Sequence, residues 1–166
     1  MAGEIVVVLA ADTIVTAGAW LLEAPQWSAS LGYPECGVRF EGRLVVGRDD
    51  TFWGSATGDY ENFAKGTVGD TAYEYPTSTE INRMRWMAAA RSLLMGTIGN
   101  EISARGPTEQ AISPENVPKI ITEGNAGSDV TCAPVQVGAA LLICERNGRT
   151  ISELRMPLQL TQRVPG

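Results

Sequence analysis

Three short hydrophobic runs that resemble one another divide this chain of 166 residues into repeating units. They are "EGRLVVG" at 41–47, "ARSLLMG" at 90–96 and "GAALLIC" at 138–144, and their leucines lie 49 and 48 residues apart. A repeat of about 40 to 50 residues is the spacing of propeller blades, each of which is a small antiparallel sheet. The sequence therefore predicts a single all-β domain, a partial β-propeller-like arrangement of about three antiparallel blade units at approximately 1–66, 67–115 and 116–160.

Turn-forming residues separate each repeated run from a second hydrophobic run, as in antiparallel hairpins. Asp49-Asp50 precede "TFWGS", the residues 98–100 precede "EISARG", and Asn147-Gly148 precede "RTISEL". The Asn-Gly pair predicts a type I′ turn, because both residues readily take positive φ angles. The proline-rich stretch 106–134 predicts a long connection that contains one edge strand, at 119–123.

The segment "INRMRWMAAARSLLMG" at 81–96 is open to two interpretations. Its content of Ala, Met, Leu and Arg favours a helix on propensity alone. Its apolar positions nevertheless alternate as in a strand, with Met84, Trp86 and Ala88 on one face and Arg83, Arg85 and Met87 between them. We expect a strand, a turn at 89–92 and a second strand, with the helix as the alternative.

The amino-acid composition argues against several kinds of catalytic and binding site. The chain has no histidine, which excludes Ser-His and Cys-His nucleophile pairs and histidine-ligated zinc. Its net charge of −6 argues against a general phosphate-binding surface, which needs clustered basic groups. Cys36, Cys132 and Cys144 lie far apart and in no C-x-x-C spacing, so we expect reduced, buried thiols. We expect neither a metal nor a cofactor.

The stretch "WGSATGDYENFAKG" at 53–66 permits a catalytic and a structural interpretation. Asp59 and Glu61 would point to the same side of a strand, near the geometry of paired glycosidase carboxylates. With a sugar-stacking platform of tryptophans, they would make the chain a carbohydrate-binding or glycan-hydrolysing β-propeller. Acids in turns are more often caps or solvated surface, and tryptophans are more often core anchors. The tryptophans in question are Trp20, Trp27, Trp53 and Trp86.

Four longer blocks, covering about 27–154, follow one another in the order "GYPECGVRFEGRLVVG", "FWGSATGDYENFAKGTVGDTAYEY", "EINRMRWMAAARSLLMGTIGNEISARG" and "ISPENVPKIITEGNAGSDVTCAPVQVGAALLICERNGRTISEL". This succession resembles the propeller-bearing portion of the tail nozzle proteins, also called tail tubular protein B, of short-tailed bacteriophages. The resemblance implies a structural virion component of the tail with no enzymatic activity, assembled in the host bacterial cytoplasm. It also implies a homo-oligomeric ring around the DNA channel, beside the adaptor and portal-proximal proteins, with no sequence-specific DNA binding.

The chain departs from this family in three ways. Family members are several times longer, so we expect a segment or a minimal relative. The loop before the Trp-Gly-Ser block is shortened to "RDD" at 48–50, and "NEIS" at 100–103 replaces Gly-Glu-Trp, which removes an aromatic expected in the core. The family has no catalytic residue to transfer.

In this structural interpretation, the loop at 53–66 is a corner of a blade. Trp53 and Phe63 are expected to fill the core of the blade, and Trp86 is expected to be a further core anchor. Gly54, Gly58 and Gly66 are expected to make the corners. The expected ties of the loop backbone are Ser55, Thr57, Asp59 and Asn62.

Two surfaces are expected to matter for assembly. The run 5–9, with Ile5, Val7 and Leu9, is apolar and rich in β-branched residues, and it contains none of the charged residues that normally protect an edge strand. It is therefore the candidate self-association edge. Arg83, Arg85 and Arg91 form either a solvated strand face or an inter-subunit salt-bridge surface. We expect no targeting signal or membrane insertion, because the longest N-terminal apolar run is far shorter than a bilayer span of about 20 residues.

Overall fold

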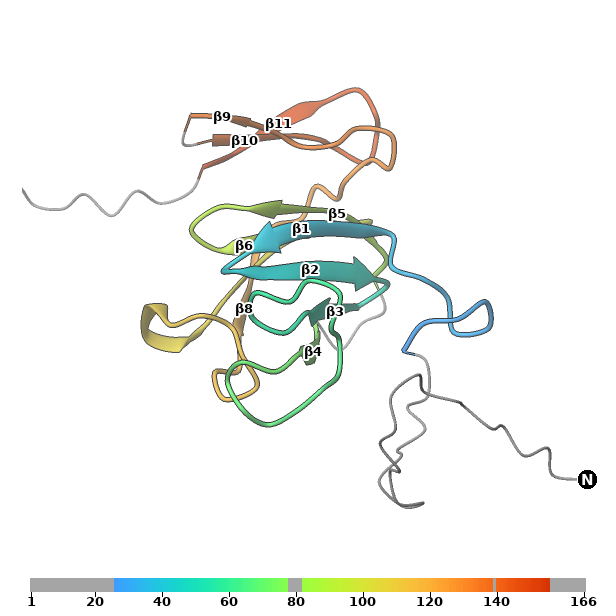
Figure 1. The fold of residues 1–166 in the computed structure, drawn as a ribbon. Coiled ribbons are helices and arrows are strands. Elements are labelled where there is room, and N and C mark those ends of the chain that lie inside the picture. The colour runs from blue at the N-terminus through green and yellow to red at the C-terminus, as the bar shows by residue number, and fades with distance from the viewer. Residues whose placement is uncertain (1–25, 78–81, 139, 156–166) are drawn as a thin grey trace, which may run out of the picture.

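The computed structural model describes residues 26–77, 82–138 and 140–155. In this part of the chain, eleven strands form three antiparallel sheets, and the one helical element is a short 3₁₀ turn, Pro107–Glu109 (Figure 1). The all-β prediction is therefore confirmed. None of the helices within these ranges is long and apolar enough to cross a membrane.

Each sheet follows the order of the chain, so that neighbouring strands are joined in sequence. The first sheet contains β1 (Cys36–Phe40), β2 (Arg43–Arg48), β3 (Thr51–Gly54) and β4 (Tyr73–Pro76). The second sheet contains β5 (Met84–Ala89), β6 (Leu93–Thr97), β7 (Glu101–Arg105) and β8 (Lys119–Gly124). The third sheet contains β9 (Val135–Val137), β10 (Ala140–Cys144) and β11 (Ile151–Arg155).

The three repeated runs lie in β2, β6 and β10, and each is followed by the antiparallel partner that the turn residues predicted. The edge strand expected at 119–123 is β8, at the edge of the second sheet. The segment 81–96 contains β5 and β6, which confirms the strand prediction over the helix. Two unit boundaries do not coincide with the sheets, because β4 and β8 pair back onto β3 and β7 beyond residues 66 and 115.

The turn types differ from the prediction. Of Asn147 and Gly148, only Gly148 has a positive φ, of 65°, so the turn is not of type I′. Gly148 N donates to Glu145 O (2.8 Å), and Asn147 Oδ1 accepts from the backbone of the two residues that follow Gly148. The type I′ pattern of two positive φ angles occurs instead at Glu41 and Gly42 (48° and 74°), between β1 and β2.

The second sheet is buried on both faces, between the first and third sheets (Figure 1). The first core lies between the first and second sheets and includes Phe40, Val45, Phe52, Tyr73, Met84, Met87, Leu93, Met95, Ile102, Ala104 and Ile112. The second core lies between the second and third sheets and contains Trp86, Leu94, Leu141 and Ile143. The described residues thus form an open stack and do not close into a ring.

A β-bulge in β5 changes which side chains share a face. Met84 pairs with Thr97 and Trp86 pairs with Gly96, so Arg85 is an extra residue in the ladder. Met84 and Met87 consequently lie in the first core, whereas Trp86 lies in the second. The prediction that Met84 and Trp86 share one face, with Met87 on the other, was wrong because simple alternation fails at a bulge.

Candidate functional site

The loop 55–72 connects β3 to β4 and is held by one buried arginine. Arg43 Nη1 donates to Ser55 O (2.5 Å) and Thr71 O (2.8 Å), and Nη2 donates to Gly69 O. Its guanidinium carbon lies 5.3 Å from the centre of the Tyr73 ring, and the residue is 3% exposed. Sequence reasoning missed the role of Arg43. The only feature of the sequence that could have indicated it is an arginine within a hydrophobic run.

Of the four expected ties of this loop, two act through their side chains. Ser55 is fully buried, accepts from Leu44 N (3.0 Å) and donates to Ala56 O (3.0 Å). Asn62 Oδ1 accepts from Ala64 N (3.0 Å). Thr57 and Asp59 contribute backbone bonds, in which Thr57 N donates to Asp70 O (2.9 Å) and Asp59 N to Ala56 O (3.2 Å).

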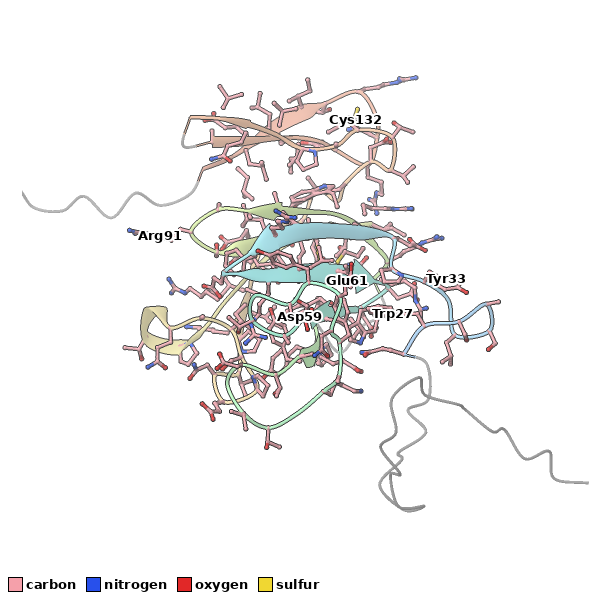
Figure 2. All side chains as sticks on the ribbon, viewed as in Figure 1. Trp27, Tyr33, Asp59, Glu61, Arg91 and Cys132 are labelled. Atoms are coloured by element: carbon pink, nitrogen blue, oxygen red, sulfur yellow. The ribbon has the colours of Figure 1, made fainter. Side chains whose placement is uncertain are left out.

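Asp59 and Glu61 do not lie in a strand. Asp59 N and Asn62 N donate in two successive turns, to Ala56 O and Asp59 O, so the strand on which the two carboxylates were expected to share a side is not formed. Both residues are exposed on the loop 55–72 (Figure 2). Solvent-facing acids in a turn are the ordinary surface arrangement.

An aromatic cap covers part of the outer face of the first sheet. Trp27 packs edge-on against Phe63 and Trp53, with ring centres 4.7 and 5.8 Å apart. In the amide orientation that satisfies both groups, Gln26 accepts from Trp53 Nε1 (2.8 Å) and donates to Phe63 O (3.0 Å). Trp53 and Phe63 thus belong to the cap, and the core position of β3 is Phe52.

The tryptophans form no open platform within the described residues. Trp53 is 7% exposed in the cap, and Trp86 is 6% exposed in the second core, where it is the anchor that the sequence predicted. Trp27 meets the other two rings of the cap at steep angles, which suits mutual packing. Trp20 lies outside the described residues.

Of the three expected corner glycines, Gly58 has the left-handed conformation, with a φ of +74°. Gly54 lies in β3, where a Cβ atom would come within 2.2 Å of Tyr73 Cζ. Gly66 likewise faces Thr71, whose Oγ1 would lie 2.7 Å from an added Cβ. Gly54 and Gly66 are therefore needed because a neighbouring side chain packs closely against the backbone. The spacing of glycines in the sequence could not distinguish this role from a role in a turn.

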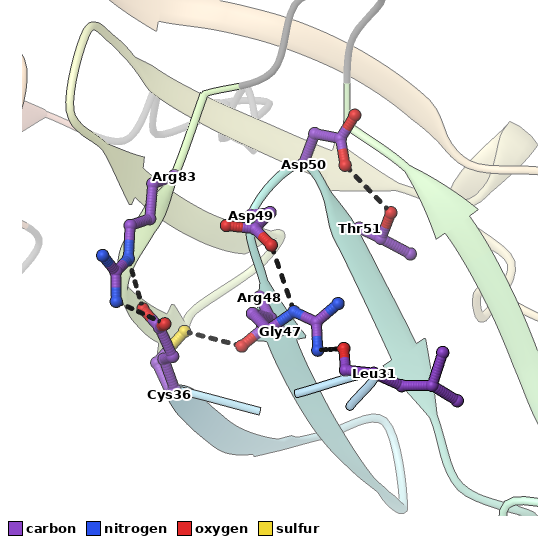
Figure 3. Close-up of polar contacts among 9 residues, drawn as sticks. Leu31, Cys36, Gly47, Arg48, Asp49, Asp50, Thr51 and Arg83 are labelled. Atoms are coloured by element: carbon purple, nitrogen blue, oxygen red, sulfur yellow. Dashed lines mark hydrogen bonds and ion pairs between the residues drawn. The ribbon is translucent and has the colours of Figure 1, made fainter. Parts of the chain in front are cut away.

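Arg83 is engaged within the chain by Glu35 (Figure 3). Two bonds, Nη2 to Oε1 (2.5 Å) and Nε to Oε2 (2.8 Å), join the residues just before β5 and β1. This bidentate contact holds the pKa of Glu35 below its usual value. Arg85 is the bulge residue and Arg91 lies in the β5–β6 turn (Figure 2), so the three arginines do not act as one uniform strand face.

The outer face of the third sheet, here called the open face, carries exposed apolar side chains that sequence reasoning missed. Val135, Val137 and Ile151 are 58%, 55% and 72% exposed. Val135 pairs directly with Leu142, and Ile151 pairs with Cys144, so these side chains share the face opposite Leu141 and Ile143. The open face is defined by its apolar residues Val135, Val137, Leu142 and Ile151, and it also contains Glu153, which pairs with Leu142. The expected edge residues Ile5, Val7 and Leu9 lie outside the described part of the chain.

The cysteines are all free, but only part of the prediction of buried thiols holds. Cys36 is half-buried, and its Sγ donates to Gly47 O (3.7 Å; Figure 3). Burial raises the pKa of this thiol to about 12. Cys132 is exposed, because it lies in the loop between β8 and β9. No group of three or more Asp, Glu or Cys side chains within the described ranges could hold a metal ion.

Neither the family models nor the curated proteins contain a match to this chain.

Proposed function

We propose that this chain is a non-enzymatic structural component of a bacteriophage tail, a nozzle or tubular protein that contributes to a ring around the DNA ejection channel. The observation that carries the proposal is the stack of three sheets, which is partly covered at one end by the aromatic cap and exposes apolar side chains on the outer sheet face at the other. An apolar face of this kind favours burial against another protein surface. The resemblance of 27–154 to tail nozzle proteins supplies the identity of the assembly.

The three sheets are proposed to be consecutive blades of a propeller that further sheets complete. Three features support this. Every sheet is a meander in chain order, the second sheet has apolar residues on both faces, and the third sheet has one strand fewer than the others. A closed propeller normally needs at least four blades, so completion requires another sheet against the open face. A neighbouring copy of the chain would supply it in a ring.

The proposed partners are other copies of this chain, the adaptor and the portal-proximal tail proteins, in the virion tail. DNA would pass without sequence-specific contact. The net charge of −6 supports this part of the proposal, because a chain with few clustered basic groups does not hold the phosphate backbone tightly.

Mass spectrometry of phage particles tests the assignment. Particles would be purified on a density gradient from a lysate of cells that carry the gene, with the non-assembled lysate fraction as the comparison. Peptides from 27–154 should band with the portal and adaptor proteins. Peptides found only in the non-assembled fraction would contradict a role in the virion.

The alternative is a carbohydrate-binding or glycan-hydrolysing protein that uses Asp59 and Glu61. The exposure of both carboxylates is the one observation that favours it, because a substrate could reach them. The double variant Asp59→Asn, Glu61→Gln decides between the two. Glycan turnover by the wild-type chain that is lost in a folded double variant would establish the alternative, and no turnover by either chain is the result we expect.

A further inference from the structure

A pair of thiols lies where the second sheet is connected to the third. After β8, the chain passes through residues 125–134 before β9 begins. Ser128 forms a β-bridge with Glu145, and Asp129 N donates to Cys144 O (3.0 Å). Arg146 N donates in turn to Gly127 O (2.9 Å). The connection is thus joined by backbone bonds to the end of β10, at the position of Cys144.

Asp129 also closes a tight turn directly after its contact with Cys144. Its Oδ1 accepts from Thr131 N (2.7 Å) and from Thr131 Oγ1, an arrangement that closes the turn directly before Cys132. The segment that contains Cys132 is paired to β10 on both sides, because Asp129 N donates to Cys144 O (3.0 Å) and Val135 pairs with Leu142. This pairing places Cys132 beside the end of β10 that carries Cys144. Burial, and next the neighbouring Cys132 side chain, raise the pKa of the Cys144 thiol.

The two thiols differ in access. Cys132 is exposed, whereas Cys144 is half-buried beside it. An external reagent therefore meets Cys132 first, and Cys144 is placed to react second. Cys36 belongs to the first sheet, where its thiol is hydrogen-bonded to Gly47 O, and it provides an internal control.

We propose that Cys132 and Cys144 form a thiol-oxidation site, which a small disulfide such as oxidised glutathione converts into an intramolecular disulfide. The Cys132 thiolate attacks one sulfur of the reagent, the reagent's S–S bond breaks, and one glutathione leaves as a thiolate that takes up a proton. The Cys144 thiolate, its proton lost to water, then attacks Cys132 Sγ and releases the second glutathione. Two protein thiols are oxidised, and one glutathione disulfide is reduced to two thiols.

The bond would fasten the connection between the second and third sheets to β10. Cross-linking two segments that are already adjacent in the folded chain stabilises it mainly by restricting the unfolded chain. We expect the oxidised protein to melt roughly 5–10 °C higher than the reduced protein. This inference does not rest on the proposed tail function, because any protein with this thiol pair would react in the same way.

The experiment treats the full chain with oxidised glutathione and follows it by intact mass and peptide mapping. The wild-type chain and a Cys36→Ala variant should lose two hydrogen atoms, retain no glutathione and yield a linked Cys132–Cys144 peptide. Cys144→Ser should instead stop with one glutathione on Cys132, and Cys132→Ser should react much more slowly. Melting curves before and after oxidation give the change in Tm.

Three results would overturn the inference. A wild-type chain that keeps glutathione on Cys132 as its final product would show that Cys144 does not reach it. Disulfides formed only between chains would show the same. A linked chain that melts at or below the temperature of the reduced chain would show that the bond distorts the fold.

Discussion

Arg43 shows how a single buried charge positions a whole loop. Its guanidinium donates to three backbone carbonyls of 55–71, which would otherwise lose their hydrogen bonds in a buried site. The local sequence indicated a strand here but not the role of its arginine, because the three acceptors lie 12 to 28 residues away. Such a role depends on tertiary contact and is not visible in a local pattern.

Replacing this arginine should be costly. Arg43→Met removes the donors and leaves buried carbonyls unpaired, so the free energy of unfolding should fall by about 2–4 kcal/mol. Arg39→Met is the matched control, because exposed Arg39 only stacks over Tyr60, at 4.7 Å, and should cost less than about 1 kcal/mol. Denaturant unfolding of both variants measures this, and equal losses would contradict the anchoring role.

The glycines Gly54 and Gly58 should respond differently to asparagine. Gly58 has a positive φ and open space around its Cα, so Gly58→Ala should cost about 1 kcal/mol and Gly58→Asn less. At Gly54 any Cβ meets the Tyr73 ring, so alanine should cost about 1–3 kcal/mol and asparagine at least as much. Thermal unfolding of the four variants tests this, and a rescue by asparagine at Gly54 would refute the packing role.

The Glu35–Arg83 pair should make stability depend on pH in acid. The folded-state pKa of Glu35 is lowered from 4.5, so the pair contributes stability that is fully present above 4.5 and is lost as pH falls through the lower, folded-state pKa. Glu35→Gln should therefore be slightly less stable than wild type at pH 7, and equal to it in strong acid. The effect should be small and reduced by salt, because both side chains are partly exposed.

Urea unfolding of wild type and Glu35→Gln between neutral and acidic pH measures the difference. A difference that grew as the pH fell would contradict the assigned direction of the pKa shift.

At the scale of the element, strands were predictable where alternation and turn residues agree, as in the hairpins of β2 with β3 and of β6 with β7. The bulge in β5 was not predictable. The register of β5 against β6 depends on side chains that pack into two different cores, one on each face of the strand. The burial of Glu101 and Ser103 in β7 likewise could not be predicted from the pattern of hydrophobic residues. Their partners, Ser128 and Glu123, come from distant positions in the sequence.

Met87 tests the bulge directly. Alternation without a bulge places Met87 opposite Met84, but the bulge buries both in the first core, where Met87 is 8% exposed. Met87→Ala should therefore cost about 2–4 kcal/mol of unfolding free energy. Arg91→Ala, in the exposed β5–β6 turn, should stay within about 0.5 kcal/mol and serves as the control. A cost for Met87→Ala as small as that of the control would mean that the bulge is misplaced.

At the scale of the molecule, the repeat spacing was enough to predict three antiparallel sheets and their order. It could not place the unit boundaries, because β4 and β8 return to their sheets only after long excursions. It also could not reveal the asymmetry of the stack. The cap and the open face depend on which side of each strand is covered, and that follows from packing between sheets.

We propose that copies of this chain associate through the open face at the end of the stack. Light scattering coupled to size-exclusion chromatography, with electron microscopy of the same fractions, tests it on wild type, Ile151→Lys and the control Val68→Lys. Val68 is 60% exposed on the loop 55–72, far along the chain from the open face. Wild type and Val68→Lys should form ring-shaped oligomers with increasing concentration, and Ile151→Lys should shift toward monomer because a lysine resists burial in an apolar interface. A wild-type chain that stays monomeric at every concentration, or an Ile151→Lys variant that assembles as well as the control, would contradict association through the open face.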